Sequence, residues 1–343
     1  MLISDFDFDL PEELVAQTPL ERRENSRMLV VNQAAQNFVD EQFYNFPNFL
    51  NDGDVLVLNN TKVFPARLLG ASETGAKIEV FLVREIENKT WETLARPARR
   101  LKIGKQIIFG GNLRAEVLEK TVDGRVRVKF ETEKNFDEIL DEIGNTPLPP
   151  YIKRENENLQ TDRERYQTVF AKERGAIAAP TAGLHFTPEV LEVVKRRGVE
   201  ILEITLHVGY GTFEPVRVSD LSEHKVAAEM CEITEETAKI LNRAKSESRR
   251  IVAVGTTTTR ALESFTNQCG KILSGKRAAD LTVTPGYKFK TVGALLTNFH
   301  LPQSSLLVLV STFAGSELIM NAYRHAVAAQ YRFYSYGDCM FIF

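Results

Sequence analysis

Residues 176–188, AIAAPTAGLHFTP, place His185 in a loop of small residues directly before a helix start. Thr187 is the expected N-cap, because its side chain can accept a free backbone amide, and Pro188 fits the first turn, where its missing N–H costs nothing. Apolar residues then recur at helical spacing, and cations followed by Gly198 mark the end of this helix. The stretch therefore predicts a helix over 188–197 whose start lies beside a loop that a ligand can approach closely.

The chain on either side of this loop alternates between helices and strands. Helices are expected at 188–197, 234–247 and 259–268, and strands at 199–208, 251–254 and 306–312. This alternation is typical of an α/β domain, in which loops at the sheet edge are available to a ligand.

Residues 61–149 differ, because their signal is entirely β. Apolar runs at 77–84, 91–95 and 106–109 read as strands, and Asp123-Gly124 reads as a hairpin turn before the strictly alternating segment 125–130. Short strands with no helical pattern between them predict a small barrel or sandwich. The expected plan is a discontinuous α/β catalytic domain, residues 1–60 and 150–343, with an inserted all-β domain, residues 61–149.

Histidines gather in loops of the α/β part. His207, His224 and His300 lie, like His185, in segments rich in Gly, Pro, Thr or Asn, where functional side chains are often held. No two histidines have the i, i+4 spacing of a zinc site, and the three cysteines are far apart. These histidines are therefore expected to form hydrogen bonds or transfer protons. A structural role in a tight turn is the alternative for each one taken alone.

Four consecutive threonines, Thr256–Thr259, follow the strand 251–254 and Gly255 at a predicted helix start. Their hydroxyls can cap the helix or bind a polar ligand, and capping accounts for only one or two of them. The segment lacks the glycine and lysine pattern of a phosphate-binding Walker loop, and Gly209-x-Gly211 lacks the third glycine of a dinucleotide fingerprint.

Composition limits the partners and the compartment. The 343 residues suggest two domains, and the net charge of −3 requires any RNA contact to use a local patch. Residues 96–105 hold five cations and no acid, which indicates either a phosphate-binding face or a charged strand edge; residues 163–174 are the competing segment. The acidic start and three unpaired cysteines predict a cytoplasmic protein.

Ten segments spread along the chain match one known family. They are NSRML (25–29), VLNNTKVFPAR (57–67), PLPPYI (147–152), RYQTVF (165–170), the His185 loop (176–188), HVGYGTF (207–213), VGTT (254–257), PGY (285–287), TNFHLP (297–302) and YRFYSYGD (331–338). In these segments the chain resembles the S-adenosylmethionine:tRNA ribosyltransferase-isomerases of bacterial queuosine biosynthesis, and the resemblance covers nearly the whole chain.

The resemblance implies a fold, a reaction and a set of site residues. The implied fold is an α/β domain with an inserted barrel. The implied reaction moves the ribosyl group of S-adenosylmethionine to 7-aminomethyl-7-deazaguanine at the tRNA wobble position, giving epoxyqueuosine-tRNA and releasing adenine and methionine. The implied partners are S-adenosylmethionine and a tRNA with a GUN-type anticodon. The enzyme is expected to be a monomer without a metal or any other cofactor.

We assign the implied roles as follows. The catalytic candidates are His185, His207, His300 and Asp338. The substrate-binding candidates are Arg27, Arg67, Thr181, Gly183, Gly209, Gly211, Thr256, Thr257, Asn298 and Tyr336. The tRNA-contact candidates are Arg96, Arg99, Arg100, Lys102 and Lys105. The loops of His185, His207 and His300 are expected to converge on one pocket.

Two positions depart from the family pattern. Ala227 stands where a second histidine is usual after His224, and Gly293 stands where an aspartate is usual before the TNFH loop. No catalytic role is assigned to either. The departures keep open a catalytically weakened tRNA-binding relative. A conventional methyltransferase is disfavoured because no glycine loop follows a first strand near the start of the chain.

Overall fold

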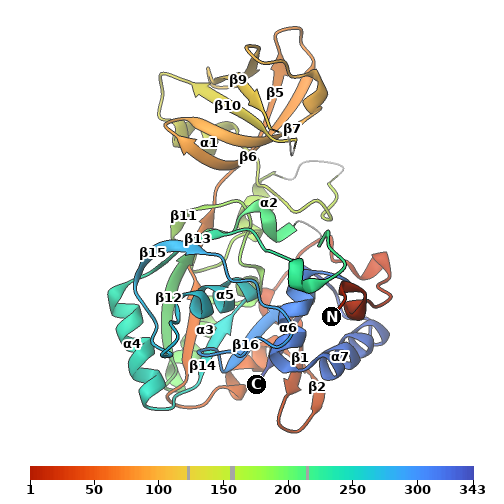
Figure 1. The fold of residues 1–343 in the computed structure, drawn as a ribbon, viewed down its shortest axis with the longest axis vertical. Coiled ribbons are helices and arrows are strands. Elements are labelled where there is room, and N and C mark those ends of the chain that lie inside the picture. Colours follow the sequence, from red (N-terminus) through yellow and green to blue (C-terminus); the bar gives the residue numbers. More distant parts are fainter. Residues whose placement is uncertain (122–123, 155–158, 214–215) are drawn as a thin grey trace.

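The computed structural model describes residues 1–121, 124–154, 159–213 and 216–343, and these residues form two bodies (Figure 1). The larger body contains a nine-stranded mixed sheet, and the smaller one is a closed six-stranded barrel. The predicted fold class, a larger mixed α/β part with a small all-β barrel, is confirmed.

The large sheet places four parallel strands side by side. Its order is β15-β13-β12-β3-β14-β16-β17-β1-β2. Its strands are β1 (Arg27–Asn32), β2 (Asn37–Gln42), β3 (Val55–Asn59), β12 (Glu200–Leu206), β13 (Glu229–Ile233), β14 (Ile251–Val254), β15 (Gly275–Ala279), β16 (Ala294–Asn298) and β17 (Cys339–Ile342). Strands β12, β3, β14 and β16 run parallel, so their carboxyl ends lie along one edge. Every residue of β3, β14 and β16 is buried, as expected for parallel strands covered on both faces.

Helices cover both faces of this sheet because successive side chains of each strand point to opposite sides. Leu56 and Leu58 of β3 pack in one layer, with α3 and the 3-10 helix η4, whereas Val55 and Val57 pack in the other layer, with α4, α5, α6 and α7. The bounds of these helices are η4 (Phe43–Phe49), α3 (Pro188–Arg196), α4 (Glu235–Ser246), α5 (Thr256–Phe265), α6 (Ser305–Ala314) and α7 (Ser316–Ala328).

The predicted helix starts are confirmed for α3 and corrected for α5. Val190 N donates to the Thr187 hydroxyl at 3.3 Å, and Pro188 occupies the first turn of α3. Helix α5 instead begins after Gly255, whose φ of +96° favours glycine, and no threonine side chain caps it. The hydroxyls of Thr258 and Thr259 donate to main-chain carbonyls four residues back, at 2.7 and 3.2 Å.

The predicted strand at 306–312 is wrong, because these residues belong to α6. The Ser304 hydroxyl accepts the amide of Leu307, and Leu307–Val310 are buried in the core. A short apolar run that is buried on all sides carries no period that would separate strand from helix. Within the described residues, no single helix is long and apolar enough to cross a membrane; α6 and α7 meet that test only together, as a pair bent by 119°.

The barrel closes in the order β10-β7-β6-β5-β8-β9. Its strands are β5 (Arg67–Ser72), β6 (Lys77–Glu87), β7 (Thr90–Arg96), β8 (Gln106–Phe109), β9 (Arg114–Lys120) and β10 (Val126–Glu131). The alternation predicted for β10 puts Val126, Val128 and Phe130 in the barrel core. Gly124 of the predicted turn has a φ of +85°, and Asp123 lies outside the described residues.

One helix in this region departs from the all-β prediction. Helix α1 (Phe136–Ile143) begins at Asn135, whose side chain accepts the amides of Asp137 and Glu138. Its buried Ile139 and Leu140 pack against the barrel core. The cap and the i, i+3, i+4, i+7 spacing of Phe136, Ile139, Leu140 and Ile143 are the sequence signal that the all-β interpretation overlooks.

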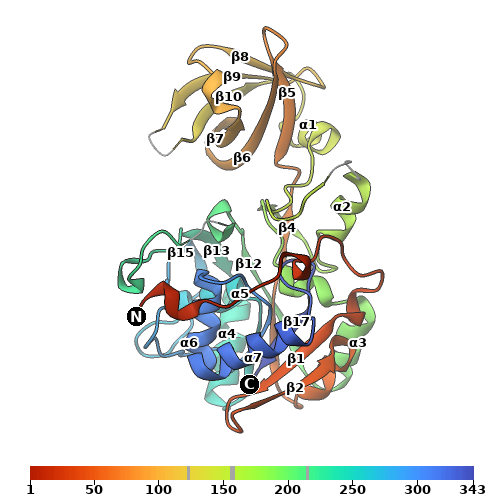
Figure 2. The ribbon, with the colours of Figure 1, turned by 90° about the vertical axis from the view of Figure 1, so that its right-hand side faces the viewer.

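The two bodies are joined by short segments (Figure 2). Strand β4 (Thr61–Val63) leads toward the barrel and pairs in parallel with β11 (Glu173–Ala176). Helix α2 (Leu159–Arg165) lies on the returning chain. Division of the chain at residues 60 and 150 stays a prediction.

Candidate active site

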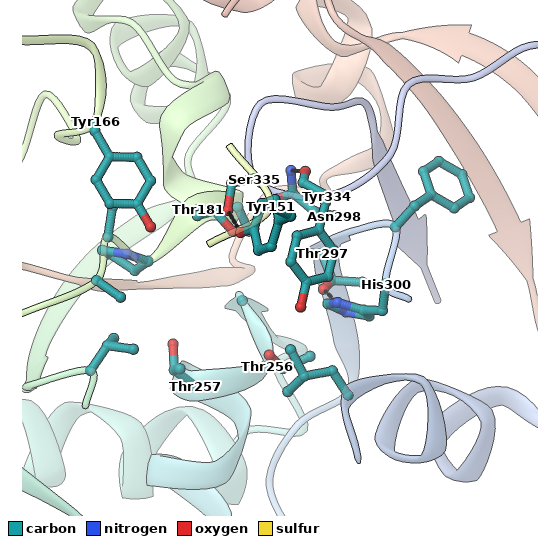
Figure 3. A pocket seen from close by; sticks show the side chains of 18 residues that line it. Tyr151, Tyr166, Thr181, Thr256, Thr257, Thr297, Asn298, His300, Tyr334 and Ser335 are labelled. Carbon is teal, nitrogen blue, oxygen red and sulfur yellow. Dashed lines mark hydrogen bonds between the residues drawn. The ribbon is translucent and has the colours of Figure 1, made fainter. Parts of the chain in front are cut away.

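A cavity of about 550 Å³ lies at the carboxyl ends of β14 and β16 (Figure 3). This edge of a parallel sheet is where open α/β folds bind their ligands. Residues from distant parts of the chain line it: 178–182, 255–257, 297–300 and 334–335, with Tyr151, Tyr166, Val208 and Leu306. We call it the main cavity, and it exists only because the tertiary fold brings these loops together.

The start of α5 forms one wall of the main cavity. Thr256 and Thr257 line it and lie across from Tyr151 and Asn298 (Figure 3). Because the next two threonines bond to the main chain behind them, only this first pair can offer hydroxyls to a ligand. Thr181, another predicted substrate-binding residue, lines the same cavity.

His300 is the histidine that lines the main cavity. Its Nε2 lies 2.9 Å from the hydroxyl of Thr297, and its backbone N–H donates to the Tyr323 hydroxyl at 3.1 Å. Burial lowers the pKa of His300 to about 3, so its imidazole is neutral at physiological pH. A neutral imidazole in this position can donate or accept one hydrogen bond.

Aromatic side chains form the opposite wall. The rings of Tyr151 and Tyr334 meet edge to face with centroids 3.9 Å apart, and the Tyr151 and Ser335 hydroxyls form a hydrogen bond. The backbone of Tyr334 has a φ of +74°, a left-handed conformation that costs a non-glycine residue about 1 kcal/mol or more. Asn298 Nδ2 donates to the carbonyl of Tyr334 at 2.8 Å and helps to hold this turn.

The oxygen of the Asn298 amide, which lies near the His185 side chain, is not paired in this way. Its Oδ1 is buried and accepts no hydrogen bond from the described residues. Buried polar atoms in native proteins are nearly always paired, so an unpaired acceptor beside a cavity indicates a place for a ligand donor.

His185 lines a second, smaller cavity of about 310 Å³. The two cavities share Ser335 as a lining residue. His185 Nδ1 lies 2.7 Å from the Ser26 hydroxyl. Burial lowers the pKa of His185 to about 4, although the nearby Asn298 side chain opposes this shift. His185 is therefore neutral, and it lies beside the main cavity and not in it.

His207 lies outside both cavities, although its neighbour Val208 lines the main one. Its Nδ1 is 2.8 Å from the Thr61 hydroxyl, and its ring packs so closely on Gly175 that a Cβ there would lie 2.6 Å from Cε1. Burial lowers the pKa of His207. The three histidine loops thus meet at one site as expected, whereas the three imidazoles do not share one pocket.

Several other predicted site residues have structural contacts away from the main cavity. Asp338 accepts the amides of Arg27 and Arg332 at 2.9 and 2.8 Å, and burial raises its pKa. The Arg27 guanidinium stacks 3.7 Å from the centroid of the Tyr331 ring. Arg67 pairs with Glu79 at 2.8 Å on the barrel.

The predicted glycines also lie outside the main cavity. Gly183 faces Phe170 and Thr168, the amide of Gly209 donates to Glu229 at 2.9 Å, and Gly211 packs against Ala227. A Cβ at Gly183 or Gly211 would lie 2.7 Å from a neighbouring side chain, so their small size serves close packing, whereas a Cβ at Gly209 would lie 3.9 Å from Glu229. Tyr336, by contrast, is buried at the smaller cavity.

The site also contains residues to which the sequence assigns no individual role. They are Tyr151, Tyr166, Tyr334 and Ser335 at the main cavity and Arg23, Ser26 and Arg165 at the smaller one. All except Arg23 lie in PLPPYI, RYQTVF, YRFYSYGD or NSRML, which are among the segments that match the family. Their place in these segments is the sequence signal that marks them as site residues. Within the described residues, no three His, Cys, Asp or Glu side chains gather in a group that could hold a metal ion.

The predicted tRNA-contact residues lie on the barrel. Arg96, Arg99, Lys102 and Lys105 are exposed, and the side chain of Arg100 lies outside the described part. Lys105 pairs with Glu73 at 3.2 Å. Arg96 lines a groove of about 870 Å³ between the two bodies, together with Arg67 of the barrel and Arg154 of the larger body.

Comparison with known proteins assigns the family. The model of the family "Queuosine biosynthesis protein" matches residues 3–342. The chain belongs to this family. The ribosyltransferase-isomerase resemblance seen in the sequence is thereby confirmed over the full chain.

Curated relatives agree with this assignment over their whole length. The S-adenosylmethionine:tRNA ribosyltransferase-isomerase of Natranaerobius thermophilus is 49% identical over 345 residues, covering 100% of this chain and 99% of the relative. The enzyme of the same name from Desulfitobacterium hafniense is 50% identical and is covered completely. A crystal structure of S-adenosylmethionine tRNA ribosyltransferase from Thermotoga maritima is 36% identical, with a TM-score of 0.56 and coverage of 99% of this chain and 100% of that one.

The two departures from the family pattern lie at different places in the fold. Gly293 precedes β16, whereas His300 follows this strand, so the two positions lie at opposite ends of it. Ala227 lines a groove of about 1270 Å³ with His224 and residues of both bodies. Neither residue lines the main or the smaller cavity.

Proposed function

We propose that this queuosine biosynthesis family member is an S-adenosylmethionine:tRNA ribosyltransferase-isomerase whose donor binds in the main cavity. The observation that carries the proposal is the full-length match, at about half identity, to enzymes of this name. The position of the cavity at the carboxyl ends of parallel strands supports it.

The acceptor that we propose is 7-aminomethyl-7-deazaguanine at the wobble position of a tRNA with a GUN-type anticodon. Transfer and isomerisation of the ribosyl group give epoxyqueuosine-tRNA and release adenine and methionine. The reaction needs removal of a proton from carbon activated by the sulfonium, and a hydrogen bond or proton for the departing adenine. It also needs a neutral amine as nucleophile, and a desolvated site favours the neutral form.

We assign the polar contacts of the donor to residues of the main cavity. His300 is the candidate for proton transfer or hydrogen bonding, since it is neutral and lines the cavity. Thr256, Thr257 and the Asn298 amide can hold sugar or base groups. His185 acts beside this set from the smaller cavity, and His207 supports the junction of β4 and β11.

The surroundings of the reaction follow from its substrates. We place the enzyme in the cytoplasm, where tRNA is modified, and propose that it works as a monomer. The proposed steps are proton transfers and ribosyl transfer, which need no metal.

Two labels on the donor test this function. With precursor tRNA, label in the ribose should appear in the tRNA, and label in the methyl group should leave with free methionine. Release of adenine supports the transferase, whereas S-adenosylhomocysteine would identify a methyltransferase. Binding of tRNA without either product would identify a weakened relative. Methyl label retained in the tRNA would overturn the proposal.

A further inference from the structure

The smaller cavity contains two arginines that have no acidic partner among the described residues. Arg23 donates to the carbonyls of Gln167 and Glu164, at 2.7 and 3.1 Å. Arg165 donates to the carbonyls of Glu21 and Leu20, at 2.9 and 2.5 Å. Neither guanidinium forms an ion pair with an Asp or Glu in the described part of the chain. Within that part of the chain, both positive charges therefore lack a paired acidic side chain.

Further unpaired groups surround the same cavity. Arg165 Nε and the Tyr336 hydroxyl are buried, and neither forms a hydrogen bond with the described residues. Tyr336 is 5% exposed. His185 is 4% exposed and interacts with the Asn298 side chain, so it is not counted with them. Leaving two donors unpaired is costly, so the arrangement indicates that a ligand supplies the acceptors.

The local electrostatics favour an anion. Burial and the nearby charge of Arg165 lower the pKa of Arg23, and Arg332 adds a third positive charge near His185. The Arg332 Nη1 atom is also buried and has no partner among the described residues, although the nearby Asp338 carboxylate offsets part of the charge of Arg332. Positive groups held together in a partly buried site repel one another until an anion neutralises them.

The position of this cavity identifies the anion. It adjoins the main cavity at Ser335, so one extended small molecule can occupy both. S-adenosylmethionine has a nucleoside at one end and an α-carboxylate at the other. The planar guanidinium forms two parallel hydrogen bonds with a carboxylate, a geometry that matches this end of the donor.

We propose that the smaller cavity binds the α-carboxylate of S-adenosylmethionine through Arg165, Arg23 and the Tyr336 hydroxyl. This inference rests on the proposed function, because that function supplies the donor. It places adenosine in the main cavity and lets the methionyl part pass Ser335 into the smaller cavity.

Ligand pairs test this proposal without the need for turnover. Isothermal titration calorimetry, in the absence of tRNA, compares S-adenosylmethionine with its decarboxylated analogue, which keeps the nucleoside and the sulfonium. We expect the parent enzyme to bind the carboxylated ligand about 10–100-fold more tightly, the usual value of hydrogen bonds to a charged group. Arg165→Gln should bring the two affinities to within about threefold.

Two further variants keep the test decisive. Tyr336→Phe removes a single hydroxyl and keeps the aromatic ring, so it should lower the preference a few-fold even if Arg165→Gln fails to fold. Arg22→Gln removes a charge from the same chain segment, but that guanidinium pairs with Glu24 and its side chain is 71% exposed. The control should therefore keep the parent preference.

The outcomes separate this inference from the proposed function. Equal affinity of the parent for both ligands, or an unchanged preference in Arg165→Gln and Tyr336→Phe, overturns the carboxylate site. Weaker tRNA binding with an unchanged ligand preference would assign the cavity to an RNA phosphate and would also overturn it. Adenine release by the parent enzyme tests the function separately, so either conclusion can fail while the other stands.

Discussion

At the residue scale, burial decides what each histidine can do. His300 and His185 are nearly inaccessible, and their pKa values fall from 6.5 to about 3 and about 4. A neutral imidazole beside a substrate can take a proton transiently or orient a leaving group, whereas a charged imidazole would repel the sulfonium of the donor. The sequence places these histidines in loops, but their degree of burial follows from the packing of the loops.

The depressed pKa values predict a loss of stability in mild acid. Because the unfolded chain protonates these histidines below about pH 6.5 and the folded chain does not, their contribution is complete above that pH. It is lost as the pH falls toward the folded-state values. Between about pH 5.5 and about pH 4.5, the free energy of unfolding of His300→Gln should fall less steeply with decreasing pH than that of the parent. The two slopes should differ by roughly 1 kcal/mol per pH unit.

Denaturant titrations at the two pH values measure this difference. The double variant His185→Gln/His300→Gln should flatten the dependence further, because both buried imidazoles are then absent. Parallel curves for the parent and His300→Gln would show that His300 is protonated in the folded protein.

At the element scale, α5 is the helix that positions the wall of the main cavity. Arg260 of α5 pairs with Glu229 of β13 at 2.8 Å, and both side chains are 4% exposed. Glu229 also accepts the amide of Gly209, and Arg260 donates to the carbonyl of Leu281. This pair ties α5, which begins at Thr256, to β13, the strand beside the loop that follows His207.

Removal of the Glu229 carboxylate, the partner of Arg260, should lower the free energy of unfolding strongly. Glu229→Gln keeps an acceptor for Gly209 but leaves the buried Arg260 charge unpaired, which should cost about 3–5 kcal/mol. Glu247→Gln is the matched control, because Glu247 pairs with arginines at the surface and its loss should cost less than about 1 kcal/mol. Urea unfolding of both variants measures the contrast, and equal losses would contradict a special role for the buried pair.

At the scale of the whole molecule, the surface that we propose for the RNA substrate spans two bodies with a groove between them. On the barrel, Arg125 and Arg127 pair with Glu92 and Glu119, at 3.2 and 2.7 Å, so these cations are partly neutralised. Arg163 and Arg174, in the competing segment, both contact Asp141. The exposed cations Arg96, Arg99 and Lys102 form no ion pair in the described part and remain the better candidates for phosphate contacts.

Neutralising two of these cations should weaken tRNA binding and its dependence on salt. Arg99→Gln/Lys102→Gln removes two phosphate contacts and should lower the slope of log affinity against log salt by roughly 1–2 units. Binding of S-adenosylmethionine alone should be unchanged, because the barrel face does not line either cavity.

The control for this pair replaces cations that already have partners. Arg127→Gln/Arg163→Gln removes the same formal charge from Arg127, paired with Glu119, and Arg163, paired with Asp141. We expect filter-binding titrations to show a smaller change in slope for the control. A larger change in the control would contradict the assignment of the RNA face to Arg99 and Lys102.

The sequence by itself determined the local structure of this protein. Periods of two and of about 3.6 residues, a cap at Thr187 and turn residues predict the α/β alternation and the barrel strands, because these signals act over a few neighbours. Motif order along the chain determined the family and the loops that carry the site. The sequence does not predict α6 as a helix, because its buried apolar run has no period. It also misplaces the start of α5, because Gly255 stands there in place of a polar capping residue.

Only the tertiary structure decided which of these loops share a cavity. His300, Thr256 and Tyr151 meet from segments more than 40 residues apart, whereas His207 and Asp338 turn to partners elsewhere. Arg23 and Arg165 lie 142 positions apart, and their shared cavity has no signal in either segment alone. Burial, pairing and charge depend on contacts between distant residues, and folding creates those contacts by packing both faces of one sheet.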